Sequence, residues 1–220
     1  IMFPLKYNLS FSMENPFISI VPQEKLSQTM KLVFLAPAEA FWMSMKVSFV
    51  AALVLALPVI FYQLWKFISP GLLAKEKKYV LPFVISATAL FMAGAAFCFF
   101  IVLPFAMGFL LTYKLGDVLM PMLSVGLYVD FCLKFILAFG AVFELPIVII
   151  FLTRMGIVTT KTLAKNRKYA VLIAFIIAAV LTPTPDVFNQ TLMAIPIIIL
   201  YEVGILVSRI FVRGKTADAG

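Results

Sequence analysis

The residue whose chemistry is most informative is Glu144, a carboxylic acid inside the apolar run 139–150. A carboxyl group at the depth of a lipid bilayer costs several kcal/mol unless it is protonated, finds a hydrogen-bond partner or faces a polar cavity. The chemistry expected of such a residue is recognition through hydrogen bonds. We therefore expect Glu144 to meet a polar group inside the membrane.

No set of residues typical of catalysis accompanies Glu144. The sequence has no histidine, no Gly-rich phosphate loop and no GxSxG or HExxH motif. Cys98 and Cys132 stand alone in apolar runs, without the spacing of metal ligands or redox pairs. We interpret both cysteines as buried apolar residues, and we expect no enzyme, no cofactor and no metal site.

Composition indicates an all-α polytopic membrane protein. Apolar residues make up 64% of the chain, charged residues make up 13%, and the mean hydropathy is +1.10. Soluble domains contain roughly 45–50% apolar residues. The net charge is +8, but the lysines and arginines gather at the ends of apolar segments, so we expect the lipid bilayer and not a nucleic acid as the partner of these charges.

Apolar segments with the length and composition of membrane spans occur at about 41–64, 79–103, 127–152, 169–181 and 191–207. About 20 residues are needed to cross roughly 30 Å of hydrocarbon. The last two segments are short, so we expect thinned membrane or a water-filled depression at their ends. Together the five segments form a predicted transmembrane domain, 41–207.

The distribution of lysine and arginine predicts the orientation of the spans. These residues are concentrated in the connections at about 65–78 and 153–168, and again in the tail 208–220. Because basic residues are enriched in cytoplasmic connections, we expect these three segments, and with them the C-terminus, to be cytoplasmic.

The remaining connections are then predicted to lie on the outer side. Residues 1–40 contain prolines and polar residues and are predicted to form an ordered cap, in which the run 31–35 is a short strand or a helix. The outer loop at about 104–126 contains the apolar run 105–111, which we expect to be an interfacial helix. The first residues, 1–5, look like the end of an apolar helix, so we expect a preceding span to be missing from this sequence.

Several segments resemble the TatC family, the multispanning subunit of the twin-arginine protein translocase, and they occur in the family's order. The resemblance covers nearly the whole chain. Its segments are 57–72 with 75–78, 139–140 with 143–146, 155–157, 167–169, 181–190, 194–196 and 201–202.

The resemblance implies a glove-shaped helical bundle of six spans in the bacterial inner membrane, of which this sequence lacks the first. It also implies a receptor that binds the twin-arginine signal peptides of folded proteins. Such a receptor forms homo-oligomers, recruits the single-span subunits TatA and TatB, and supports export driven by the proton-motive force.

The resemblance assigns Glu76 to the arginine pair of the signal peptide, because a carboxylate accepts two hydrogen bonds from a guanidinium. The alternative is that Glu76 pairs with the lysines beside it. Phe67 and Trp65 are expected to pack beside the signal peptide, or to serve only as aromatic residues at the membrane interface.

The resemblance places Glu144 and Gln190 in an intramembrane polar patch that contacts the signal peptide or a partner helix. A protonated Glu144 would donate a hydrogen bond to Gln190 or to a partner side chain. The alternative is an internal hydrogen bond that fixes two helices of this chain.

The other polar or special residues receive structural interpretations. Asp130 and Lys134 are spaced as an ion pair on one helix. Asp186 is placed to cap the last helix, Glu202 is a second polar residue inside a span, and the role of Pro4 stays open.

A second function remains open from the residues alone. Glu144, Glu202 and Lys134 are ionisable groups within or near spans, as a small-solute or ion secondary transporter requires. This alternative predicts flux through the isolated chain without any partner.

Overall fold

The computed structural model describes residues 7–11, 18–22, 32–68, 80–112, 123–182 and 187–217. Contacts within the chain divide it into two compact units. The first comprises Ile1–Val54 with Ala95–Leu137, and the second comprises Leu55–Gly94 with Ala138–Gly220.

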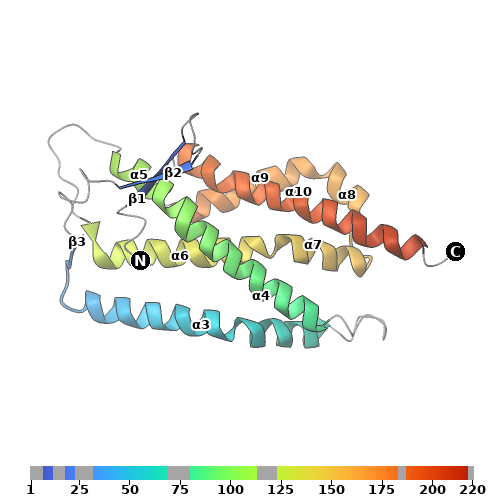
Figure 1. Ribbon diagram of the computed structural model, residues 1–220, viewed down its shortest axis with the longest axis horizontal. Coiled ribbons are helices and arrows are strands. Elements are labelled where there is room, and N and C mark those ends of the chain that lie inside the picture. Colours follow the sequence, from blue (N-terminus) through green and yellow to red (C-terminus); the bar gives the residue numbers. More distant parts are fainter. Residues whose placement is uncertain are drawn as a thin grey trace. The chain divides into compact units, whose positions relative to one another are not determined.

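Long apolar helices dominate the described residues (Figure 1). They are α3 (Glu39–Ile68), α4 (Val80–Phe97), α6 (Val125–Phe143), α7 (Leu145–Arg154), α9 (Arg167–Leu181) and α10 (Val187–Ala217).

Within the described residues, four stretches are long and apolar enough to cross a membrane: Glu39–Phe67, Val80–Gly108, Val125–Arg154 and Gln190–Ile210. They coincide with four of the predicted spans. The fifth predicted span is α9, whose 15 residues extend over about 22 Å, which is short of the hydrocarbon thickness, as its sequence indicated.

The second span is longer than the sequence predicted. After α4 the chain forms a π-helical turn, η3 (Cys98–Val102), and continues directly as α5 (Leu103–Thr112). The wide turn is closed by the Leu103 N–H, which donates to the Cys98 carbonyl, and it precedes Pro104, which has no N–H to donate. The run 105–111 was expected to be a separate interfacial helix, and this expectation is corrected because the run belongs to α5.

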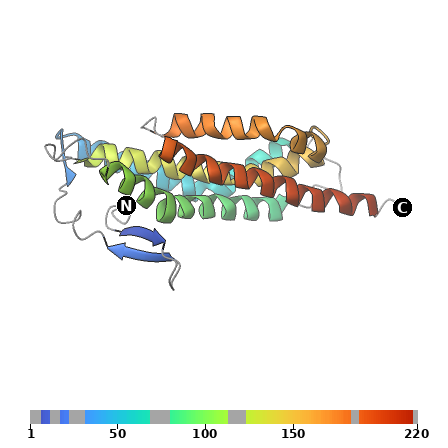
Figure 2. The same cartoon turned by 90° about the horizontal axis from the view of Figure 1, so that it is seen from above.

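Short strands occur in the first unit. β1 (Tyr7–Phe11) and β2 (Ile18–Pro22) pair antiparallel, as Figure 2 shows. β3 (Leu32–Val33) pairs in parallel with β4 (Leu123–Ser124), so the run 31–35 contributes to a strand and not to a helix.

Both cysteines are buried and free, as predicted. Cys98 lies in η3 and Cys132 in α6, and both belong to the core of the first unit together with Phe135 and Met107.

Helices of the second unit approach closely at glycines. A Cβ atom on Gly94 of α4 would lie 2.7 Å from Cγ of Phe143. A Cβ atom on Gly204 of α10 would lie 2.7 Å from Cδ1 of Ile149 in α7. Small residues at helix interfaces bring backbones together in membrane proteins, where van der Waals packing drives association.

Candidate functional site

Glu144 lies where α6 ends and α7 begins. Its own N–H donates to the Ala141 carbonyl at 3.2 Å, which is the i to i−3 bond of a 3₁₀ turn. Its carbonyl accepts from the Val148 N–H at 3.0 Å. Pro146, the second residue of α7, has no N–H to continue the ladder. The break therefore has a local cause in the sequence, and it places a carboxyl group inside the span Val125–Arg154.

One carboxylate oxygen of Glu144 has no hydrogen-bond partner in the part of the chain that the structure describes. Atom Oε1 is buried, and among the described residues no donor or acceptor forms a hydrogen bond with it. Buried polar atoms in native proteins nearly always have a partner, and leaving one without costs about 1–3 kcal/mol. The site therefore has an unused hydrogen-bonding atom inside a span.

Gln190 does not supply the missing partner. Its Nε2 donates to the Phe175 carbonyl at 3.1 Å, which links the start of α10 to α9. The direct hydrogen bond with Glu144 that the sequence allowed is therefore absent, and the internal role of Gln190 is to join two other helices.

Trp65 and Phe67 differ sharply in their surroundings. The Trp65 side chain is 6% exposed, and its ring centroid lies 4.6 Å from that of Phe83 and 6.1 Å from that of Phe151. Phe67 is 84% exposed. The structure thus uses Trp65 to hold α3 against its neighbours in the second unit and leaves Phe67 available for contact with another molecule.

Pro4, Glu76 and Asp186 lie outside the described residues.

Glu202 forms an ion pair that the sequence did not predict. Arg167, at the start of α9, contacts both of its oxygens, with Nε at 2.7 Å from Oε1 and Nη2 at 2.8 Å from Oε2. Beside this pair, the Tyr201 hydroxyl donates to the Leu163 carbonyl of α8 (Thr160–Lys165) at 3.0 Å. The two interactions attach the connection between α8 and α9 to α10.

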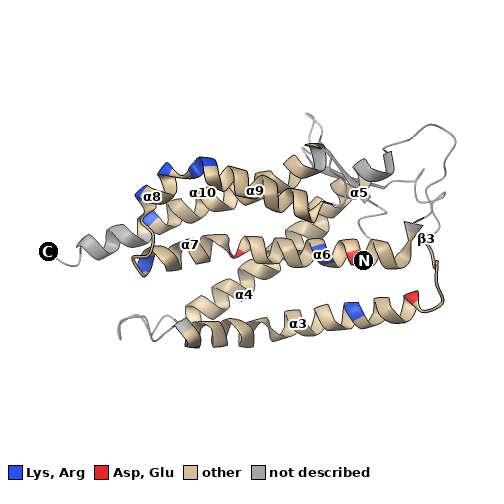
Figure 3. Ribbon diagram, turned by 180° about the vertical axis from the view of Figure 1, so that it is seen from behind, with Lys and Arg blue, Asp and Glu red and all other residues tan. Residues whose placement is uncertain are grey.

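Basic residues gather at this corner, as Figure 3 shows around α8 and the adjoining end of α9. They are Lys161, Lys165, Arg167 and Lys168. Such a cluster at one end of a helical bundle is typical of a cytoplasmic surface.

Asp130 has a different partner from the one expected. Lys46 of α3 contacts both of its oxygens, with Nζ at 2.8 Å from Oδ1 and 2.7 Å from Oδ2. The prediction of an ion pair with Lys134 is therefore corrected. Spacing along one helix predicted a neighbour on that helix, but Lys46 reaches Asp130 from a second helix.

Glu39 is a further residue that the sequence reasoning missed. Its carboxylate accepts hydrogen bonds from the Leu35 N–H at 2.6 Å, from the Gly126 N–H at 2.7 Å and from the Ser124 hydroxyl. It thereby holds the segment that leads into α3 and caps the start of α6. The acidic residue in the first turn after Pro37 was the available signal.

No metal site is found in the described part of the chain, where no group of three or more Asp, Glu or Cys residues comes together. Within the same described residues, the arrangement instead provides a carboxyl oxygen without a hydrogen-bond partner inside the span Val125–Arg154.

Comparison with known proteins gives consistent matches. A sequence model of the family described as "Sec-independent protein translocase protein (TatC)" matches residues 1–196. The TatC protein of Carboxydothermus hydrogenoformans is 42% identical over 207 residues, which cover 94% of this chain and 84% of the relative. The TatC protein of Desulforapulum autotrophicum is 46% identical over 193 residues, covering 88% and 71%.

Solved structures agree. A crystal structure of the twin arginine translocase receptor TatC has a TM-score of 0.72 and 42% identity, covering 83% of this chain and 80% of that chain. A second, in DDM, has a TM-score of 0.74 at the same identity, covering 82% and 80%.

Proposed function

Because this chain belongs to the TatC family, we propose that it is the receptor of a twin-arginine translocase, binding signal peptides and recruiting TatA and TatB. The chain is a multi-pass membrane protein and a subunit of a protein translocase. The proposal adds what that subunit recognises. The observation that carries it is the buried Oε1 atom of Glu144, which has no partner among the described residues.

An unpartnered carboxyl inside a span favours a partner that is itself a membrane segment. Lipid tails offer no hydrogen-bonding group, whereas a single-span helix with one polar side chain does. Hydrogen bonds between helices in a bilayer contribute about 0.6–2 kcal/mol each. Glu144 is then the place where a helix of TatA or TatB, or the signal peptide, docks, and Gln190 is included only because the family resemblance places it in the same patch.

The short helix α9 offers an apolar surface for such a helix. Its Ala174 and Ala178 are fully buried within the second unit, while Ile176 and Val180 are exposed. An apolar partner helix would cover this exposed side by ordinary packing.

The arginine pair of the signal peptide requires a different chemistry. We propose Glu76 for this role because a carboxylate matches the two-donor geometry of a guanidinium, and Lys cannot reproduce that geometry. Phe67, exposed near the end of α3, would pack against the apolar part of the peptide. The basic cluster at α8 supports a cytoplasmic position for the C-terminus and for the peptide's entry side.

Site-specific photo-crosslinking in native membranes containing TatA and TatB tests the proposal. Probes at positions 76 and 144 are compared for a twin-arginine precursor and its twin-lysine variant, and a probe at Val180 on α9 reports general helix contact. We expect precursor adducts at 76 that disappear with twin-lysine, and TatA or TatB adducts at 144. A folded chain that gives adducts at neither position would overturn the receptor assignment.

The ion pair of Glu202 weighs against the transporter alternative, which expected this carboxylate to be one of its ionisable groups. Glu202 is held by Arg167 in a two-contact ion pair, so its carboxylate is engaged by a permanent cation. Flux measured with the purified chain in vesicles, without TatA or TatB, would be needed to revive it.

A further inference from the structure

The short helix α9 has one continuous apolar face that its own unit does not cover. Leu172, Ile176 and Val180 follow one another at intervals of four residues, and they are 56%, 53% and 80% exposed. Residues four apart lie on one side of a helix, so these three form a stripe along α9. Ala174 and Ala178, which are fully buried, mark the opposite side. The stripe is therefore the outward face of α9.

A basic group lies at the start of this outward face. Lys168 is exposed, and its amine lies 5.2 Å from the centre of the Tyr169 ring. Tyr169 is 53% exposed and stands one turn before Leu172 and two turns before Ile176, so its ring continues the stripe. Contact with this ring places the Lys168 amine on the same side. The charge and the apolar stripe thus belong to one face of a single helix.

No described acidic residue neutralises Lys168. The sequence contains no aspartate or glutamate between Glu144 and Asp186. Among the described residues of the second unit, the acids are Glu144, inside a span, and Glu202, whose two oxygens are both engaged by Arg167. Lys168 itself forms no ion pair with any residue that the structure describes. It therefore keeps its positive charge beside the stripe.

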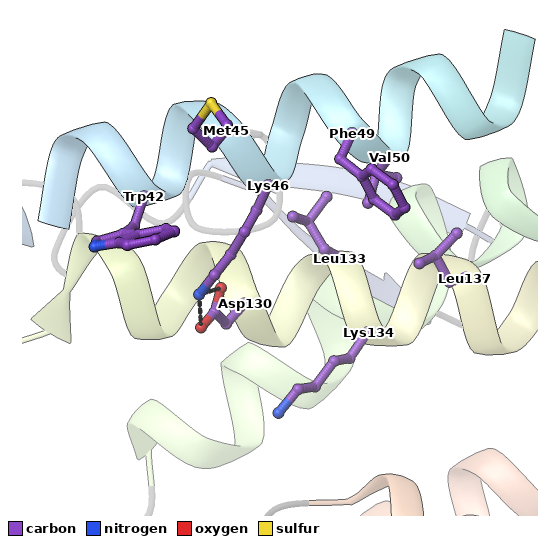
Figure 4. Close-up of a pocket in the computed structure, with 9 residues that line it drawn as sticks. All are labelled: Trp42, Met45, Lys46, Phe49, Val50, Asp130, Leu133, Lys134 and Leu137. Atoms are coloured by element: carbon purple, nitrogen blue, oxygen red, sulfur yellow. Dashed lines mark hydrogen bonds and ion pairs between the residues drawn. The ribbon is translucent and has the colours of Figure 1, made fainter.

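Figure 4 shows the contrasting case of Lys46, a lysine that also stands among apolar side chains. Its amine lies 2.8 Å and 2.7 Å from the two carboxylate oxygens of Asp130, so its counter-ion comes from within the chain. An external anion is not required there. It is the missing counter-ion that distinguishes α9.

Further positive charge surrounds the start of α9. Lys161 and Lys165 are exposed one turn apart on α8, in the cluster that Figure 3 shows at this end of the second unit. Such a group of lysines attracts anionic lipid headgroups, and the attraction falls off within a Debye length. Lys168 is the member of the group that lies directly above the apolar stripe.

The stripe has the length of one leaflet. From Lys168 to Val180 the helix rises about 18 Å, at 1.5 Å per residue. Half of a 30 Å hydrocarbon layer is about 15 Å thick. A lipid of the leaflet that faces α8 therefore reaches both ends of the stripe, with its phosphate at the lysine and its chain beside the helix.

We propose that the outward face of α9 binds an anionic phospholipid of the leaflet that faces α8. Its phosphate accepts hydrogen bonds from the Lys168 amine, and one acyl chain lies along the stripe. A lipid joins an anion and an apolar chain in one molecule, as α9 joins a cation and an apolar stripe on one face. A signal peptide that carries an arginine pair would bring like charges together, so Lys168 disfavours it. A partner helix that covers Ile176 and Val180 replaces the acyl chain, so the two occupants alternate.

Photo-crosslinking from the lipid tests the proposal. The purified chain is reconstituted in phosphatidylcholine vesicles without TatA or TatB, so the outcome does not depend on the receptor assignment. A minor fraction of the lipid is phosphatidylglycerol with a photoreactive group on its acyl chain, and matched vesicles contain phosphatidylcholine with the same group. Mass spectrometry then locates the adducts. At Leu172, Ile176 and Val180 we expect about fivefold more adducts with phosphatidylglycerol, the effect of one lysine near a membrane surface.

Leu55 of α3 is the internal reference for general contact with lipid. Its side chain is 81% exposed, and more than two helical turns separate it from the nearest lysine along α3, Lys46. We expect both photoreactive lipids to label it equally.

Variants of the lysines connect the preference to one charge. Lys168→Gln should bring the two lipids to about equal labelling of α9, and Lys168→Arg, which keeps the charge, should retain the preference. Lys66→Gln removes the same charge from the end of α3 and should leave the preference at α9 unchanged. If Lys168→Gln does not fold, excess unlabelled phosphatidylglycerol added to the native chain should suppress the α9 adducts, and excess phosphatidylcholine should not.

Three results would overturn the proposal. The first is equal labelling of α9 by both lipids, or a preference that survives Lys168→Gln. The second is the same preference at Leu55, because the anionic lipid then gathers around the whole chain. The third is a complete lack of lipid adducts along α9 while Leu55 is labelled, because another copy of the chain then covers this face.

Discussion

The ring of Phe91 fills the space that a side chain at Gly140 would need. A Cβ atom on Gly140 would lie 2.5 Å from Cζ of Phe91, and the reciprocal contact joins Gly94 to Phe143. Each of these helices thus presents a glycine to a ring of the other. Because both contacts are already tight, α4 and α6 have no room for a larger residue at either glycine.

Gly140→Ala should destabilise the chain. Overfilling a packed interface costs roughly 1–3 kcal/mol, and the ring of Phe91 must move to accept the new methyl group. Thermal unfolding in detergent, followed by circular dichroism, measures the effect. Ala141→Leu, at the exposed neighbouring position, is the matched control and should change little. A Gly140→Ala protein as stable as the native chain would contradict the close packing.

Adding Phe91→Leu to Gly140→Ala should recover part of the stability that Gly140→Ala removes. The smaller side chain leaves room for the methyl group, so the two changes should not add. Strict additivity of the two effects on the midpoint would show that the ring and the glycine are not in contact.

Glu144→Leu should separate stability from function. The change removes a buried oxygen that has no partner among the described residues. The free energy of unfolding should therefore stay the same or rise by about 1 kcal/mol, and the thermal midpoint should follow it. The same change should abolish crosslinks to TatA and TatB through a probe at the exposed position 148. Glu144→Gln serves as the polar control and should keep part of the binding.

The outcome also distinguishes the two interpretations of this carboxyl group. If Glu144→Leu lowers the free energy of unfolding of the isolated chain by about 1–3 kcal/mol, Glu144 forms an internal hydrogen bond and fixes two helices. In that case the residue is structural, and the docking patch must be sought elsewhere.

Lys46 and Asp130 should be coupled in a double-mutant cycle. Lys46→Met and Asp130→Leu each leave one charge without its partner, so the double variant should be more stable than the sum of the single effects predicts. Because both side chains are partly exposed, the coupling should be about 1 kcal/mol or less. Lys134→Met combined with Asp130→Leu is the control, and coupling there would restore the pair predicted from spacing.

Arg167→Gln and Tyr201→Phe should loosen the corner between α8 and α9. Each removes one interaction that holds this corner to α10, and the connection carries lysines that trypsin recognises. Limited proteolysis read by mass spectrometry should show faster cleavage after Lys161 in both variants. Lys168→Arg keeps the charge and the cleavage site, and its rate should match that of the native chain.

The sequence was informative wherever one segment determined its own structure. Apolar length predicted four of the spans, and the shortness of α9 was visible in its residue count. The polarity of Glu144 within an apolar run identified a residue whose Oε1 atom has no hydrogen-bond partner among the described residues. Both inferences need only local composition and the cost of polar groups in lipid.

Sequence reasoning failed where the partner lies far along the chain. Asp130 was assigned to Lys134 because the two share a helix, but its partner is Lys46, 84 residues away. The partner of Glu202 is Arg167, 35 residues earlier. Trp65 was expected beside the signal peptide or at the membrane interface, and its packing against rings from two other helices was not predicted. No pattern within a single segment encodes these pairings.

Glu39 has a consequence for the order in which the protein is made. Its carboxylate accepts from Leu35, just before α3, but it also accepts from Gly126, 87 residues later. A ribosome that has just released α3 into the membrane has not yet produced that donor. The N-terminal end of the first described span therefore completes its hydrogen bonds only when the first residues of the third have been synthesised.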